Sequence, residues 1–82
     1  MTSAELRAII VAEIGNIAPE ADTSNVREDQ DLREALDLYS MDIFNIVVAL
    51  SQRLRIIIPD ADVPKLVTLG GGIAYLSRRL GP

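Results

Sequence analysis

Residues 40–54 read SMDIFNIVVALSQRL, and they decide the fold because their β-branched content is compatible with either a strand or a helix. The apolar side chains recur every three or four residues rather than alternating. The repeating set consists of Ile43, Ile46, Val47, Leu50 and Leu54. Polar residues such as Asp42 and Gln52 fall between its members. The periodicity predicts an amphipathic helix over residues 40–54 with this stripe facing a core.

A second apolar set lies on another face of the same segment. Its members are Met41, Phe44 and Val48. Two interpretations stay open from the pattern. The set either completes a core contact with the preceding loop or forms an exposed patch for partner proteins.

The N-terminal segment carries the signals of another helix. Thr2 and Glu5 have capping-box spacing, which predicts a helix that begins at Ser3. One helical face collects Leu6, Ile9, Ile10, Ile14 and Ile17. Pro19 marks its end, because the residue before a proline avoids helical backbone angles.

Residues 18–39 form a connection that is long for a compact domain. Four apolar residues are spaced through its polar sequence, and we expect them to pin the connection onto the core. They are Val26, Leu32, Leu36 and Leu38.

The C-terminal part predicts one short and one longer helix. Residues 55–60, RIIIPD, have no second strand to pair with, so we expect a buried extended connection and a turn at Pro59-Asp60. Pro64 limits the next helix to roughly one turn. Thr68 caps the last helix, and Gly81-Pro82 ends it. Its inward face is Leu69, Ile73, Leu76 and Leu80. Residues 1–82 thus predict a single all-α domain, a bundle of three longer helices and one short helix.

Three consecutive glycines, Gly70 to Gly72, open the last helix. A phosphate-binding P-loop is disfavoured, because no Lys follows at the required spacing and no strand precedes. We expect instead a loosely wound helix start, or the close approach of another backbone or a ligand.

Composition excludes most catalytic and metal sites. The chain has no Cys and no His, which removes thiol nucleophiles, the usual zinc ligands and a Ser-His-Asp arrangement. EF-hand registers that start at Asp22 or Asp29 place Val26 or Arg33 at a ligand position. We therefore expect no enzyme activity and no metal site.

Charge and hydropathy indicate location and partners. Eight acids and two arginines fall in residues 20–42, within a net charge of −4 for the chain. This field disfavours nucleic acid. It suits a basic protein partner near Ser40, but charge alone favours the alternative that the acidic loop is merely solvated. No signal peptide or membrane-length apolar run is present, so we expect a cytoplasmic protein without membrane insertion.

Residues 36–76 resemble the acyl carrier proteins of bacterial fatty acid synthesis, in a gapless match over half of the chain. The matching features are Leu36, Ser40-Met41-Asp42, Ala49-Leu50, Ile58-Pro59-Asp60, Lys65, Thr68 and Ile73-x-Tyr75. The predicted helix order, with its long loop between helices one and two, is also similar to that family's four-helix bundle.

The resemblance implies a carrier with a covalent cofactor. A phosphopantetheinyl transferase would attach 4'-phosphopantetheine from coenzyme A to Ser40, and its thiol would hold acyl groups as thioesters. The implied partners are acyl-transferring or acyl-activating enzymes of fatty acid, lipid or polyketide synthesis, visited by a monomer. Partner recognition is expected at Asp37, Tyr39, Met41, Asp42, Phe44 and Val48.

Departures from the family pattern indicate a specialised carrier. Tyr39 stands where an Asp commonly precedes the serine, and Asp37 stands where the family usually has Gly. Asp42 is the only acid between Met41 and Pro59, in a helix that the family normally fills with acids. The glycine triplet is a candidate for widening a space between helices for a bulky acyl chain.

Two alternatives stay open. The same arm serves peptidyl or aminoacyl carrier domains. A protein-interaction module is the other alternative, in which Ser40 only caps a helix and Met41, Phe44 and Val48 dock a partner.

Overall fold

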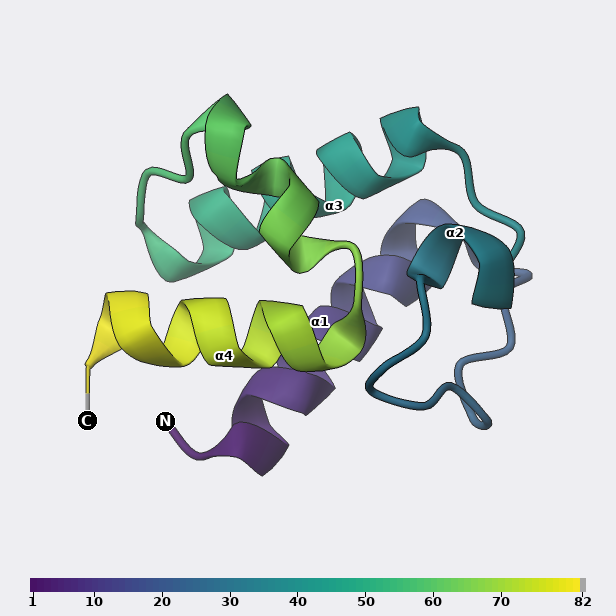
Figure 1. Cartoon of the computed structure of the whole chain (residues 1–82), viewed down its shortest axis with the longest axis horizontal. Helices are drawn as coiled ribbons and strands as arrows, with labels where there is room; N and C mark the ends of the chain where they lie inside the picture. The colour runs from purple at the N-terminus through teal and green to yellow at the C-terminus, as the bar shows by residue number, and fades with distance from the viewer. Residues whose placement is uncertain (82) are drawn as a thin grey trace.

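A computed structural model of the protein describes residues 1–81, and the predicted C-terminal stop at Pro82 lies outside them. The elements are α1 (Ser3–Ile17), α2 (Leu32–Ala35), α3 (Ser40–Leu54), the 3-10 helix η1 (Asp60–Leu66) and α4 (Leu69–Leu80) (Figure 1). No strand forms within these residues, where Asp31 and Thr68 make only an isolated bridge. The predicted all-α bundle is confirmed.

Two of the three longer helices, α1 and α4, begin where their caps predict. The Thr2 hydroxyl accepts from the Glu5 N–H, and the Glu5 carboxylate accepts from the Thr2 N–H, which completes a capping box. At α4, the Thr68 hydroxyl accepts from the Gly71 N–H at 2.9 Å. Gly81 follows α4 with a positive φ of 74°, as a glycine at a helix stop permits.

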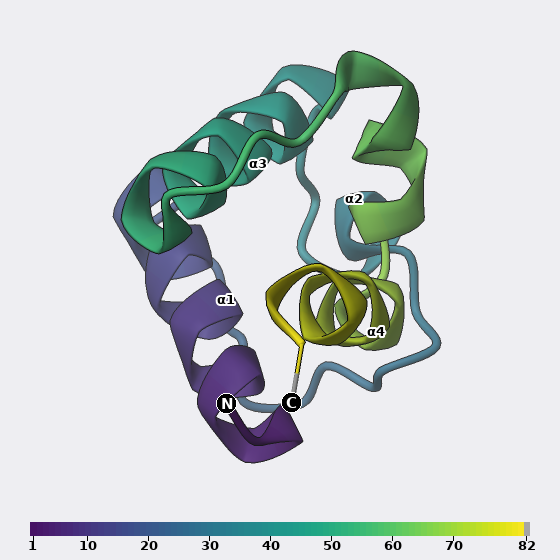
Figure 2. The same ribbon diagram turned by 90° about the vertical axis from the view of Figure 1, so that its left-hand side faces the viewer.

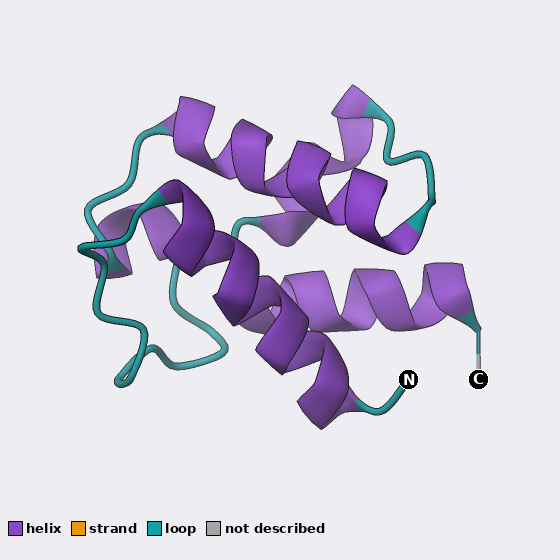
Figure 3. Cartoon of the chain, turned by 180° about the vertical axis from the view of Figure 1, so that it is seen from behind, coloured by secondary structure: helices purple, strands orange, loops and turns teal. Residues whose placement is uncertain are grey.

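Helix α1 packs against both α3 and α4, and η1 contacts the same two helices (Figure 2). Helix α2 packs on α3. The long connection that carries α2 gathers at one end of the molecule, near the start of α3, as the view from behind shows (Figure 3). The loop and the first turn of α3 therefore share one end of the bundle.

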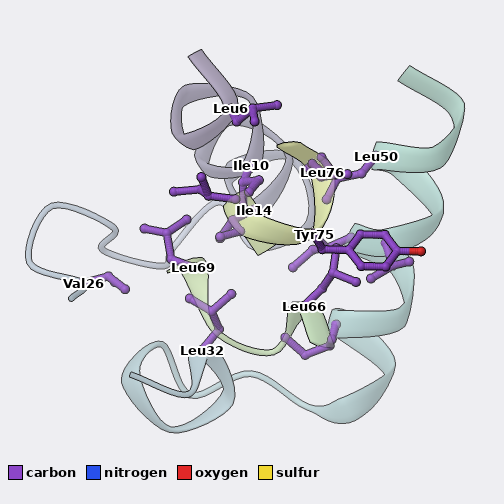
Figure 4. Close-up of a cluster of buried hydrophobic side chains, with 14 of the residues drawn as sticks. Leu6, Ile10, Ile14, Val26, Leu32, Leu50, Leu66, Leu69, Tyr75 and Leu76 are labelled. Carbon is purple, nitrogen blue, oxygen red and sulfur yellow. The ribbon is translucent and has the colours of Figure 1, made fainter. Parts of the chain in front are cut away.

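The core is aliphatic, as expected from a chain with few aromatic residues. Side chains from α1, α3 and α4 converge in it (Figure 4). Its fully buried members are Leu6, Ile14, Leu32, Leu50, Leu69 and Leu76. Val26, Leu32 and Leu38 are buried and Leu36 is partly buried, so the predicted pinning of the connection is confirmed.

Two predictions about the connections were wrong in detail. The loop contains α2, because the Asp31 carboxylate accepts from the Arg33 N–H at 2.9 Å and caps a short turn. The helix expected to span one turn near Pro64 is a seven-residue 3-10 helix with Pro64 inside it. Its i→i+3 bonding avoids the α-helical clash that a proline ring causes.

The segment after α3 is extended, as predicted, but it is not fully buried. Ile56 and Ile58 pack partly against the core, whereas Ile57 is 80% exposed. Alternation along an extended chain turns the middle side chain outward.

Close packing requires glycine at position 71 and restricts the space at positions 70 and 72. A Cβ on Gly71 would lie 2.5 Å from the Lys65 carbonyl oxygen, and one on Gly70 would lie 3.0 Å from the Glu28 carbonyl oxygen. A Cβ on Gly72 would lie 3.2 Å from Ile10 Cδ1. The expected close approach of another backbone is confirmed. Because neighbouring atoms already fill this space, the structure gives no support to an acyl pocket at the triplet.

Candidate functional site

Ser40 is the first helical residue of α3 and is exposed to solvent. The N-cap is Tyr39, whose backbone is extended at φ −88° and ψ 162°, as a cap requires. The Ser40 hydroxyl makes no hydrogen bond to any residue within 1–81. The alternative in which Ser40 serves as the cap is therefore not what the structure shows.

The start of α3 has little side-chain capping. The Asp42 carboxylate reaches back and accepts from the Tyr39 N–H at 2.9 Å, but the Tyr39 side chain caps nothing. Within residues 1–81, the backbone N–H groups of Ser40 and Met41 thus remain without an acceptor, whereas that of Asp42 donates to the Tyr39 carbonyl. The positive end of the helix dipole adds to them, so an anion on the Ser40 oxygen is electrostatically favoured.

A pocket of about 200 Å³ opens beside Ser40. Four of its lining residues are apolar, from α3, from η1 and from the segment that follows η1. Ser40 and Arg33 complete the lining, together with Ile43, Val63, Pro64 and Val67. The pocket can hold a small apolar group next to the hydroxyl, with one cationic side chain in reach.

Arg33 is fixed by an ion pair with Asp31. Its Nε donates to Asp31 Oδ1 at 3.1 Å and its Nη2 donates to Oδ2 at 2.7 Å. This hydrogen-bonded pair lowers the pKa of the Asp31 carboxyl and raises the pKa of the Arg33 guanidinium. Arg33 therefore stays charged beside the pocket.

The second apolar set of α3 is exposed, which favours the partner-patch interpretation. Met41 is 65% exposed, and Phe44 and Val48 are each 40% exposed. Tyr39, at 79%, stands next to them at the start of the helix. We call Tyr39, Met41, Phe44 and Val48 the apolar patch.

The acidic residues expected in partner recognition have different roles. Asp37 is exposed, and its φ of 56° is in the left-handed region, which Asp tolerates better than most residues. Asp42 is half-buried and bonded to the Tyr39 N–H. Only Asp37 is thus free to face a partner as a side chain, whereas Asp42 also stabilises the helix start.

Sequence reasoning missed the pocket and Arg33. Val63, Pro64 and Val67 are distant from Ser40 in sequence, and packing of η1 on α3 brings them together. The available signal was Asp31-x-Arg33, a cap followed by a basic residue two positions later. It identifies the ion pair but not its neighbour Ser40.

Two absences hold for the described chain. No group of three or more Asp or Glu side chains within residues 1–81 is arranged to hold a metal ion. Among the same residues, no helix combines the length and the apolar character that crossing a bilayer requires.

Comparison with known proteins identifies the family. No protein-family model matches the chain. The acyl carrier protein of Kineococcus radiotolerans is 35% identical over 87% of this chain and 88% of its own length. The acyl carrier protein of Renibacterium salmoninarum is 34% identical over 85% of this chain and 82% of its own length. The acyl carrier protein of Wolinella succinogenes is 29% identical over 88% of this chain and 88% of its own length. These relatives are named as carriers and not as enzymes. The chain belongs to the acyl carrier protein family.

Proposed function

We propose that the protein carries acyl intermediates as thioesters on a 4'-phosphopantetheine arm attached to Ser40. Acyl-transferring or acyl-activating enzymes of fatty acid, lipid or polyketide synthesis are its partners. The protein itself is a carrier and not an enzyme. The thiol, absent from a chain without Cys, comes with the arm.

The observation that carries this proposal is the exposed and unbonded hydroxyl of Ser40. A transferase must reach that oxygen, and no internal hydrogen bond has to be broken first. The residues around it fit a phosphodiester. Open N–H groups of the first α3 turn and the Arg33 guanidinium both favour an anion.

Attachment forms a bond between Ser40 Oγ and phosphorus. The pyrophosphate bond of coenzyme A breaks, and the nucleotide leaves with the bridging oxygen. The serine proton passes to a base supplied by the transferase, since no histidine exists in this chain. The chain's own contribution is to present the hydroxyl at a rigid helix start.

Partner enzymes are expected to dock on the apolar patch with Asp37 and Asp42 beside it. Asp42 is the only carboxylate on α3, so docking depends less on ionic contacts than on burial of Met41, Phe44 and Val48. This favours a specialised carrier with dedicated partners, and a transferase that accepts Tyr39 before the serine.

Intact mass spectrometry tests attachment. The purified protein is incubated with coenzyme A and a broad-specificity phosphopantetheinyl transferase. We expect the mass to rise by one phosphopantetheine in the wild type and in Ser77→Ala, which removes another exposed helical serine. Ser40→Ala is expected to gain nothing.

Addition of the arm to Ser40→Ala would contradict the proposal. Several transferases are tested, each shown to prime a reference carrier. If none of them modifies the wild type, the protein-interaction module is favoured. Loading of the primed protein distinguishes acyl from aminoacyl cargo, because only the matching activating enzyme produces a thioester.

A further inference from the structure

Arg33 is the only charged residue in the pocket beside Ser40. Attachment of the arm requires only the free serine hydroxyl, and it does not specify whether Arg33 binds the arm once the arm is in place. The other five residues of the pocket are the serine and four apolar residues. A guanidinium beside an apolar hollow of about 200 Å³ indicates a ligand with an anionic group and a small apolar group side by side.

The guanidinium is held in place with one edge left open. Asp31 binds the edge formed by Nε and Nη2. Within residues 1–81, Nη1 donates no hydrogen bond. A guanidinium has five N–H donors in a planar fork, so it can bind a second anion through the edge formed by Nη1 and Nη2.

The backbone that carries Arg33 is held in place as well. Asp31 also caps α2 through the Arg33 N–H, and the neighbouring Leu32 N–H donates to the Val67 carbonyl at 2.8 Å. Val67 itself lines the pocket. Because Arg33 is already oriented, it loses little further conformational entropy when an anion binds.

We propose that Arg33 anchors the phosphodiester group attached to Ser40, and that the branched apolar part of the arm next to that phosphate lies in the pocket against Ile43, Val63 and Val67. This inference rests on the proposed attachment at Ser40. It makes the first part of the arm a docked segment and leaves only the remainder freely mobile.

A carboxylate at the end of an acyl cargo shares this anionic chemistry. Ser40 itself lines the pocket, so a phosphate on its oxygen is at the site whatever the cargo. A cargo carboxylate lies at the far end of a flexible arm and must fold back, at an entropic cost. The volume also fits a compact group, since a cavity of about 150 Å³ accommodates benzene. These arguments favour the phosphodiester.

Nuclear magnetic resonance on the full chain, before and after priming, tests the anchor. Methyl signals of Ile43, Val63 and Val67 report the pocket, the Arg33 Nε–H signal reports the guanidinium, and phosphorus relaxation reports mobility of the phosphate. The variants are Arg33→Gln, Arg33→Lys and the control Arg27→Gln. Arg27 is also exposed and paired with an aspartate, Asp29, but lies outside this pocket.

We expect priming to shift the pocket methyl signals and the Arg33 signal in the wild type, and the methyl signals equally in Arg27→Gln. In Arg33→Gln the methyl shifts are expected to fall several-fold and the phosphate to become more mobile. Arg33→Lys, which keeps the charge but loses the fork, is expected to be intermediate. Spectra of the unprimed variants verify the fold, and Arg33→Lys serves as the main variant if Arg33→Gln unfolds.

The two anion sources are separated by cargo. The primed protein is compared with forms that carry a neutral acyl group or a half-thioester of a dicarboxylic acid of equal length. If Arg33 anchors the phosphodiester, the methyl and Arg33 signals must shift already in the primed protein that carries no acyl group. Shifts that appear only with the dicarboxylic cargo, or that are the same in Arg33→Gln as in the wild type, overturn it. Intact mass is measured first, so that failure to attach an arm, which overturns both proposals, is distinguished from an arm without an anchor.

Discussion

At the scale of single residues, the proposed site depends on which residue occupies which position of one helix start. Tyr39 is the cap, Ser40 is the first helical residue, and Asp42 reaches back to the backbone of Tyr39. Asp42 thereby supplies the carboxylate that Tyr39 lacks. The serine hydroxyl is left free for modification because it has no structural hydrogen bond to keep.

Arg55 ends α3 in the left-handed region, at φ 56° and ψ 44°. Most residues other than Gly are strained there, so we expect Arg55→Gly to stabilise the protein by about 0.5–1 kcal/mol. Chemical denaturation measures the change. Gln52→Gly, at an exposed position inside the same helix, is expected to destabilise by about 0.5–1 kcal/mol. Equal effects of the two substitutions would contradict the assignment of strain to Arg55.

Tyr75 links η1 to α4 through its hydroxyl, which lies at the edge of the core cluster (Figure 4). It donates to Asp62 Oδ2 at 2.7 Å and accepts from Arg79 Nη1 at 2.8 Å. The hydrogen bond from Tyr75, helped by the charges of Lys65 and Arg79, lowers the pKa of Asp62. Burial and the bond to Asp62 raise the pKa of Tyr75 itself.

We expect Tyr75→Phe to destabilise the protein at neutral pH. A carboxyl with a lowered folded-state pKa contributes stability above its ordinary pKa and loses it as the pH falls through the lowered value. The difference between wild type and Tyr75→Phe should therefore narrow between about pH 5 and pH 2. Tyr39 is an exposed tyrosine without a side-chain hydrogen bond, so Tyr39→Phe should leave the stability unchanged both at neutral pH and in the acidic range. If the stability difference between wild type and Tyr75→Phe stays constant with pH, the hydrogen bond to Asp62 is not the source of the stabilisation by the Tyr75 hydroxyl.

At the scale of helices, α4 depends on backbone contacts that only glycine permits. We expect Gly71→Ala to destabilise by about 1–3 kcal/mol, because its Cβ would meet the Lys65 carbonyl oxygen at 2.5 Å. Gly15→Ala in α1 meets nothing within 4 Å and should stabilise by about 0.5–1 kcal/mol. Thermal unfolding separates the two, since about 1 kcal/mol shifts the midpoint by roughly 4–8 °C in a domain of this size. Stabilisation by Gly71→Ala would contradict the packing.

The sequence predicted the longer helices because their caps and periodic stripes are local signals. Thr2, Thr68 and the stripe of residues 40–54 each act within one or two turns. It could not place η1 over Ser40, because that depends on how distant segments pack. The role of Met41, Phe44 and Val48 stayed undecided for a related reason. Their spacing defines a helical face, but only the completed bundle shows that each of the three side chains keeps 40–65% of its surface exposed.

At the scale of the whole molecule, the bundle presents Ser40 and the apolar patch on one rigid element. An ion pair between α1 and α3 helps to fix that element, with Arg53 Nη1 at 2.9 Å from Glu13 Oε2. Exposed residues of the apolar patch can thus be substituted without disturbing the packing of the core.

We expect Met41→Gln to leave the free energy of unfolding nearly unchanged, since Met41 is 65% exposed. Priming by a transferase should slow, with kcat/KM lower by about tenfold, which corresponds to about 1.4 kcal/mol. Ile57→Gln introduces the same polar residue at an exposed apolar position beyond α3, and this variant should prime normally. If both variants prime equally well, the apolar patch is not the docking surface of that transferase.

Peptide mapping of the protein purified from the cells that produce it tests the central proposal most directly. The tryptic peptide of residues 34–53 contains both Ser40 and Ser51, so fragmentation must assign the modified residue. We expect phosphopantetheine, free or acylated, on Ser40 and on no other residue. A bare Ser40 throughout the isolated protein, or the group on a different residue, would contradict the account.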